Sequence, residues 1–245
     1  MVEGTTDLLG LPDFSTRLSG TRELLAESGI GVLSVSTGIR FTSELESERA
    51  AQLDQARRHI DLAAELGSPY VRIFGGPIEP EMDRKATMAN IEHGFRLAAE
   101  HARERGVTVL LETHDTFATG RASKELIERI NHRSVGLIWD ILHSYRCGET
   151  FEQTLSAIGV HVRHVHLKDS SDFDENRFDL KLCGEGRLPI PEALRLLDSI
   201  GYDGYYEFEW ERGWHPQIEP PEVALPHFVR YITGLRQSLD ENDRS

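Results

Sequence analysis

The sequence contains little cysteine and no long apolar run. Its two cysteines, Cys147 and Cys183, are too few and too far apart for a disulfide framework or a cysteine-based zinc site, so we expect a reducing, cytoplasmic location. No segment reaches the roughly 18 to 20 apolar residues of a membrane span. The start of the chain also lacks the basic stretch and apolar core of a signal peptide.

Basic residues are scarce as well. The chain has 27 Lys and Arg against 41 Asp and Glu, which gives a formal net charge of −14 at pH 7. An acidic surface repels polyanions, so we expect neither nucleic acid nor a membrane surface as a partner. The 245 residues, 39% of them hydrophobic, are enough to bury the core of a single domain.

Strand-like and helix-like segments alternate along the chain. Residues 1–20 and 169–188 read as loops. Strands are predicted over 31–39, 70–76, 107–113, 135–141, 161–168 and 202–210, and helices over 21–28, 47–66, 83–105, 122–131, 150–158, 189–200 and 225–239. This alternation predicts an α/β fold with parallel strands and right-handed crossovers.

Two architectures fit the alternation, an open doubly wound sheet and a (β/α) TIM-type barrel. No glycine-rich nucleotide fingerprint follows an early strand, whereas acids and histidines end four later strands. This pattern favours the barrel, whose site lies at the C-terminal ends of its strands.

The four later strands carry chemistry at their tips. The residues are Glu112 and His114 in VTVLLETHD, Asp140 and His143 in VGLIWDILH, His164, His166, Lys168 and Asp169 in VRHVHLKD, and Glu207, Glu209 and Glu211 in YYEFEWE. Any one of them alone is more often solvated, a helix cap or a packing residue. Four successive strands with such tips are a much less probable coincidence.

Glu112, Asp140, His166 and Glu209 are the tip residues that could meet in one site. Three carboxylates packed together would cost several kcal/mol through desolvation and repulsion, and a cation removes that conflict. Three carboxylates and one imidazole suit Mn²⁺, Mg²⁺ or Co²⁺ and leave Zn²⁺ open. Of these ions we expect Mn²⁺.

The motifs resemble a known family. In order along the chain, four motifs resemble those of the xylose isomerase-like barrels: ETH at 112–114, the D-x-x-H of Asp140 and His143, HVHLKD at 164–169 and GYDGYYEFEWE at 201–211. That superfamily contains sugar isomerases, sugar epimerases, inosose dehydratases and endonuclease IV. The resemblance covers about residues 24–235 and does not specify a substrate.

The resemblance implies a role for each tip. The metal ligands fall on Glu112, Asp140, His166 and Glu209, and the two glutamates double as the acid/base pair. Family spacing selects Glu209 over Glu211, since both have the same strand parity. The family histidine that touches substrate hydroxyls falls on His143, and the further substrate-binding candidates are His114, Lys168 and Arg187.

The function implied is a divalent-metal-dependent isomerase or epimerase of a small sugar, cyclitol or related polyol, acting by proton abstraction next to a carbonyl through an enediolate. An inosose dehydratase-like lyase and a catalytically impaired sugar-binding relic are the alternatives. An abasic-site endonuclease is disfavoured by the charge of −14 and because no D-x-H motif follows His166.

The predicted strands number six, whereas a closed barrel of this family has eight. We therefore expect one domain over 1–245, an N-terminally truncated and open barrel of about six strands, with a polar tail at 240–245. Residues 1–10 could fill part of the gap as a short extended segment, or a second copy of the chain could cover it in a homo-oligomer. The remaining alternative is a reading frame that begins upstream.

Overall fold

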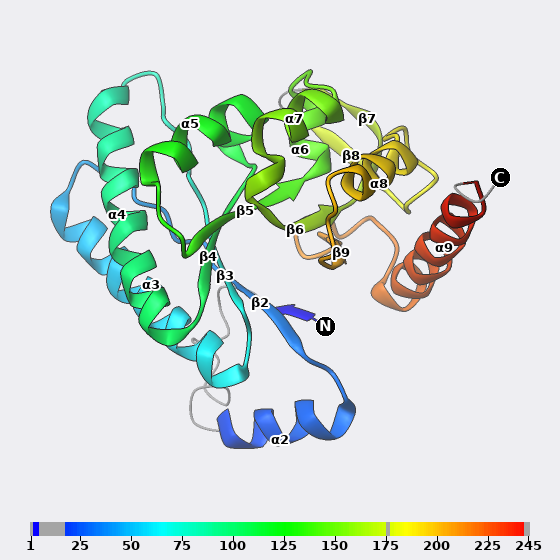
Figure 1. The fold of residues 1–245 in the computed structure, drawn as a ribbon, viewed down its shortest axis with the longest axis horizontal. Helices are drawn as coiled ribbons and strands as arrows, with labels where there is room; N and C mark the ends of the chain where they lie inside the picture. Colours follow the sequence, from blue (N-terminus) through cyan, green and yellow to red (C-terminus); the bar gives the residue numbers. More distant parts are fainter. Residues whose placement is uncertain (1, 5–17, 175–176, 243–245) are drawn as a thin grey trace. The chain divides into compact units, whose positions relative to one another are not determined.

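The computed structural model describes residues 2–4, 18–174 and 177–242 (Figure 1). The chain divides into two compact units. Unit 1 comprises Met1–Phe117 and Ala122–Ile138, and unit 2 comprises Ala118–Arg121 and Trp139–Ser245. Strand β5 (Val135–Asp140) and helix α5 (Gly120–Ile130) each contribute residues to both units.

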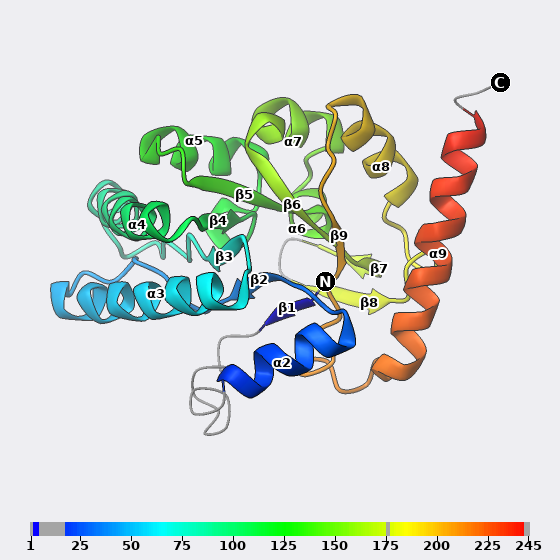
Figure 2. The same ribbon diagram turned by 60° about the horizontal axis from the view of Figure 1, so that its bottom comes forward.

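Unit 1 is a parallel sheet with helices. Its strands are β1 (Val2–Gly4), β2 (Val32–Ser36), β3 (Tyr70–Ile73), β4 (Thr108–Glu112) and the first part of β5, paired in that order. Its helices are α2 (Leu18–Ser28), α3 (Glu46–Leu66), α4 (Arg84–Arg105) and most of α5. Helices α3 and α4 lie side by side, as Figures 1 and 2 both show.

The core of unit 1 follows from the apolar runs. Every residue of β2 is buried, and Val35, Val71, Val109 and Leu137 have no exposed surface. Strands of a parallel sheet covered on both faces are apolar along their whole length, which is why these runs do not alternate.

Unit 2 contains α6 (Ile141–Arg146), α7 (Phe151–Ile158), β6 (Val162–Leu167), α8 (Ile190–Ser199), β9 (Tyr206–Phe208) and α9 (Pro221–Asn242). Strand β9 pairs with β6 in parallel, with His166 opposite Glu207. Between β6 and α8, β7 (Asp169–Phe173) and β8 (Phe178–Lys181) form an antiparallel hairpin.

All six predicted strands are present, each shorter than predicted, and β1 pairs beside β2 as the extended N-terminal alternative had it. Residues 2–4 form β1 within a segment predicted to be mostly loop, and the predicted loop was wrong at 169–173 and 178–181, which form the hairpin strands. The hairpin sequence is too polar to show strand periodicity, and its pairing is supported instead by the Ser170 hydroxyl, which contacts the Asp172 and Asp179 carbonyls.

The first and last helices differ most from their predicted bounds. Helix α2 begins at Leu18, while residues 5–17 lie outside the described residues. The last helix begins at Pro221 and continues to Asn242, so the predicted polar tail starts inside α9, and 243–245 is not described. Helix α6 was not predicted. None of the helices in the described part of the chain has the length and hydropathy needed to cross a membrane.

Candidate metal centre and active site

Strands β6 and β9 present four side chains to one side of unit 2. His164 and His166 are two residues apart on β6, and Glu207 and Glu209 are two residues apart at β9. Each pair therefore projects from one face of its strand. His164 Nε2 lies 2.7 Å from Glu207 Oε2, and His166 Nδ1 lies 3.5 Å from Glu209 Oε2. The two strand motifs HVH and EFE therefore meet side by side.

Asp140 reaches the same place from the end of β5. Its Oδ1 caps α6 by accepting hydrogen bonds from the amides of Leu142, at 2.9 Å, and His143, at 3.1 Å. The cap fixes the carboxylate before any ligand binds. One ligand atom each of Asp140, His166 and Glu209 lie within 4.8 Å of one another.

The ammonium group of Lys168 lies among these carboxylates. Its Nζ is 2.8 Å from Asp140 Oδ2, 2.6 Å from Glu209 Oε2 and 2.6 Å from Glu211 Oε1, and 3.3 Å from His143 Nε2. The Lys168 side chain is only 1% exposed, so these contacts are shielded from water. Burial of the Glu209 carboxyl raises its pKa, but the charges of Lys168 and His166 outweigh burial and hold the pKa well below its usual range.

Aromatic and cationic side chains lie around Lys168. The ring of Phe178, from the β7–β8 hairpin, lies 5.9 Å from the His143 ring and 5.7 Å from Lys168 Nζ. Arg146 Nε donates to His143 Nδ1 at 3.1 Å. Nδ1 accepts this bond, and Nε2 is the ring nitrogen that faces Lys168.

Asp169, the first residue of β7, binds the loop that follows the hairpin. Its buried carboxylate accepts the amides of Ser170, Gly184, Gly186 and Leu188 at 2.8 to 3.1 Å. Arg187, a predicted substrate-binding residue, is exposed on this loop. Its guanidinium carbon lies 5.9 Å from the centre of the Phe173 ring, so its contact is with the hairpin.

Unit 1 holds the two remaining predicted site residues. Glu112, at the end of β4, is buried and forms an ion pair with Arg72, with Arg72 Nη1 at 2.5 Å from Glu112 Oε2. His114 Nδ1 lies 3.0 Å from Asp115 Oδ1. Burial raises the pKa of Asp115, but the hydrogen bond from His114 and its charge bring the pKa below the usual value.

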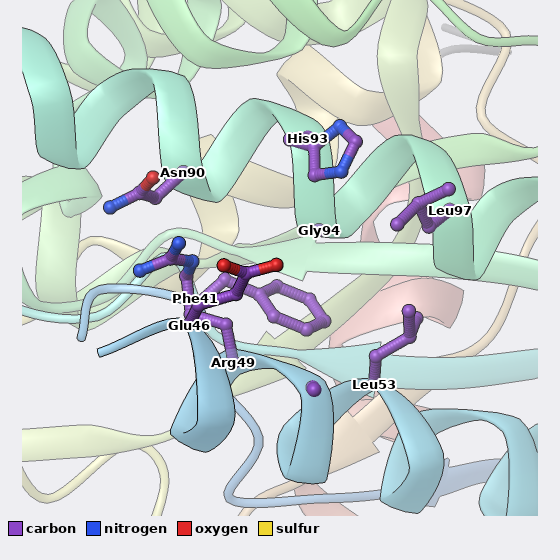
Figure 3. Close-up of a pocket in the computed structure, with 9 residues that line it drawn as sticks. Phe41, Glu46, Arg49, Leu53, Asn90, His93, Gly94 and Leu97 are labelled. Carbon is purple, nitrogen blue, oxygen red and sulfur yellow. The ribbon is translucent and has the colours of Figure 1, made fainter. Parts of the chain in front are cut away.

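A cavity of about 230 Å³ lies between α3 and α4 of unit 1 (Figure 3). Two of its polar side chains bond to carbonyl groups of the chain itself. Arg49 donates to the carbonyls of Ser43, at 2.7 Å, and Glu44, at 2.8 Å, and Asn90 donates to Ser43 at 3.4 Å. Arg49 and Asn90 therefore hold the chain before α3 in place.

Comparison with known proteins identifies the family. The model of the family described as "Xylose isomerase-like TIM barrel" matches residues 2–231 of the chain. The chain belongs to this family. Its fold class is thus the α/β barrel fold of the xylose isomerase-like proteins.

Members of the xylose isomerase-like family with known names are similar over most of the chain. An inosose dehydratase of Geobacillus thermodenitrificans is 24% identical over 247 residues, which cover 87% of this chain and 80% of that protein. The chain spans between 58% and 80% of the length of the first three curated relatives.

Two solved structures of this family share the fold. A D-tagatose 3-epimerase-like protein is 21% identical with a TM-score of 0.80, covering 98% of this chain and 89% of that one. The IOLI protein with a bound zinc atom is 20% identical with a TM-score of 0.79, covering 95% and 86%.

The donor set of unit 2 fits a divalent cation. Two carboxylates and an imidazole, with ligand atoms within 4.8 Å, are ligands that Mn²⁺, Mg²⁺, Co²⁺ and Zn²⁺ all accept. The set is buried except at Glu209, whose side chain is 22% exposed and leaves an approach for a ligand.

The sequence patterns did not indicate the roles of three residues at the site. Family spacing selects Glu209 over Glu211 as a metal ligand, but both carboxylates contact Lys168 in the structure. Asp169 was noted only as part of HVHLKD, and Phe178 lay in a segment read as loop. The bonds of Asp169 to Gly184 and Gly186 span 15 and 17 residues, so no local pattern in the sequence indicates them.

Proposed function

We propose that this protein is a divalent-metal-dependent isomerase or epimerase of a small sugar, cyclitol or related polyol. The observation that carries the proposal is the convergence of Asp140, His166 and Glu209 at strand ends of unit 2 in a xylose isomerase-like protein. Relatives named as 2-oxo-tetronate isomerase, fructoselysine 3-epimerase and inosose dehydratase support the reaction class.

Asp140, His166 and Glu209 would hold the ion, and the family resemblance assigns the fourth ligand to Glu112. A bound divalent ion would polarise the substrate carbonyl and stabilise the negative charge that develops on its oxygen. Proton transfer and substrate binding are proposed for side chains of the protein.

Glu209 is proposed as one of the two acid/base groups. The Lys168 ammonium keeps its carboxyl ionised, so it is able to accept a proton from carbon. The same charge lowers its basicity, so the reaction requires a C–H bond made acidic by a neighbouring polarised carbonyl. Glu112 is proposed as the partner that returns the proton, on the opposite face for epimerisation or to the adjacent carbon for isomerisation.

His143 and Lys168 are proposed to bind substrate oxygens. Their nitrogen atoms lie close together, since His143 Nε2 is 3.3 Å from Lys168 Nζ. Phe178 lies beside both groups, where its ring limits the access of water and offers an apolar face to the carbon skeleton of a polyol.

A dehydratase is the second candidate, favoured by the similarity to an inosose dehydratase over 87% of the chain. The same proton abstraction leads to loss of water when a hydroxyl group stands β to the carbonyl. The two reactions are distinguished by product mass, which falls by one water only in the dehydratase.

The test is a turnover screen over ketoses and inososes with chelated protein to which Mn²⁺ is returned. Incubation in D₂O followed by NMR reports exchange of a carbon-bound proton. We expect exchange that requires Mn²⁺ and is abolished in Glu209→Gln. If product forms without deuterium at the reacting carbon, and internal recycling of the proton is excluded, a hydride shift replaces the glutamate mechanism. Absence of turnover in the whole screen favours the sugar-binding relic.

A further inference from the structure

The Lys168 ammonium group occupies an unusual position among the acids of unit 2. It contacts one oxygen of each of three carboxylates, Asp140, Glu209 and Glu211, at 2.6 to 2.8 Å. An ammonium group has three hydrogens, one for each of these carboxylate contacts. The three carboxylates carry three negative charges, and Lys168 carries one positive charge.

Two of these contacts are made to oxygen atoms that a cation would need. Asp140 Oδ1 already accepts two backbone amides, so Oδ2 is the oxygen left for an added ligand, and Oδ2 is the atom that Lys168 contacts. Glu209 Oε2 likewise lies 2.6 Å from Lys168 Nζ. The ammonium group therefore shares the donor atoms of the proposed metal centre.

The positions of the donors do not depend on Lys168. The α6 amides hold Asp140, strand β6 holds His166, and the amide of Glu209 donates to the carbonyl of Leu167 at 3.1 Å. Removal of the lysine charge would thus leave a formed set of carboxylates with more negative charge. Buried like charges repel, and the remaining way to relieve that repulsion is a cation or a proton.

We propose that Lys168 is the internal counter-ion of this acidic cluster, which stabilises the protein without metal and opposes the binding of a divalent ion. The metal part of this inference rests on the proposed function. Lys168 acts through its charge, because it offsets part of the repulsion between the carboxylates in the free protein and sets how tightly the site holds its ion.

The experiment compares Lys168→Met with wild type, and uses Lys181→Met as the matched control. Lys181 lies in the same unit, is 41% exposed and forms an ion pair with the exposed Asp179, at 3.0 Å. Melting temperature is measured in EDTA, and Mn²⁺ affinity is measured by the loss of the free-ion EPR signal on titration. Neither readout needs a substrate.

In EDTA we expect Lys168→Met to melt roughly 5 to 15 °C below wild type, because one partner of a buried charge cluster is removed. Its Mn²⁺ affinity should rise at least about tenfold, since a like charge no longer shares the donor oxygens. Lys181→Met should match wild type in both. Equal or weaker Mn²⁺ affinity in Lys168→Met would overturn the inference.

Other outcomes separate the inference from the proposed function. If Lys168→Met binds Mn²⁺ and wild type does not, the counter-ion role is supported and a metal-dependent function of the wild type is refuted. If neither binds, both fail. If Lys168→Met does not fold in EDTA, Lys168→Gln serves as the second variant. Folding that is restored by Mn²⁺ supports the counter-ion role of Lys168. Failure to fold both in EDTA and with Mn²⁺ contradicts that role.

Discussion

Asp169 is predicted to be the most sensitive single carboxylate for the stability of unit 2. It is 1% exposed, and Oδ1 accepts the amides of Ser170 and Leu188 while Oδ2 accepts those of Gly184 and Gly186. In Asp169→Asn the side-chain amide group replaces one oxygen, and it faces two backbone N–H donors instead of accepting from them.

The magnitude follows from the two lost bonds. Hydrogen bonds to a charged group contribute about 1.5 to 3 kcal/mol each, so the loss of two predicts a decrease of about 3 to 6 kcal/mol in the free energy of unfolding. At about 2 to 4 °C per kcal/mol for a chain of this size, the melting temperature should fall by at least about 6 °C.

The matched control is Asp172→Asn on the same hairpin. Asp172 is 62% exposed and its partner Arg177 is 72% exposed, with Arg177 Nη2 at 3.3 Å from Asp172 Oδ2. An exposed ion pair of this kind contributes at most about 1 kcal/mol, so the control should remain close to wild type.

The assay is urea denaturation followed by circular dichroism, together with amide hydrogen exchange at Gly184 and Gly186. Asp169→Asn should unfold at lower urea and exchange faster at both amides. If Asp169→Asn and Asp172→Asn have the same midpoint and the same exchange, the carboxylate does not hold this loop and the reasoning is refuted.

Three further predictions concern the proposed function. Asp140→Asn and His166→Ala should show greatly reduced metal by elemental analysis, and full occupancy in both would exclude them as ligands. Glu112→Gln and Glu209→Gln should each abolish exchange of a substrate carbon-bound proton in D₂O, whereas retained exchange in either would remove that residue from the acid/base pair. With abasic-site DNA we expect no cleavage and no salt-sensitive binding, because the chain carries a net charge of −14; incision that disappears in Asp140→Asn would contradict this.

Much of the architecture was predictable because it depends on local patterns. Apolar runs such as YVRI and TVLLE form strands, and glycine ends both α3 and α4 in the left-handed conformation, at Gly67 and Gly106. The candidate ligands Asp140, His166 and Glu209 were also predictable, since parallel strands bring their C-terminal ends to one edge. The assignment of Glu112 to the same centre stays a prediction from the family resemblance.

Only the tertiary structure decided where the charges in unit 2 are compensated. A lysine side chain is long and flexible, so its position after β6 did not reveal that Lys168 would contact Asp140, Glu209 and Glu211 together. The β7–β8 hairpin was equally hidden, because hydrogen bonds of polar side chains hold it rather than an alternating apolar face. Periodicity in a sequence reports the burial of apolar side chains, whereas the pairing of charges depends on distances between segments far apart in the chain.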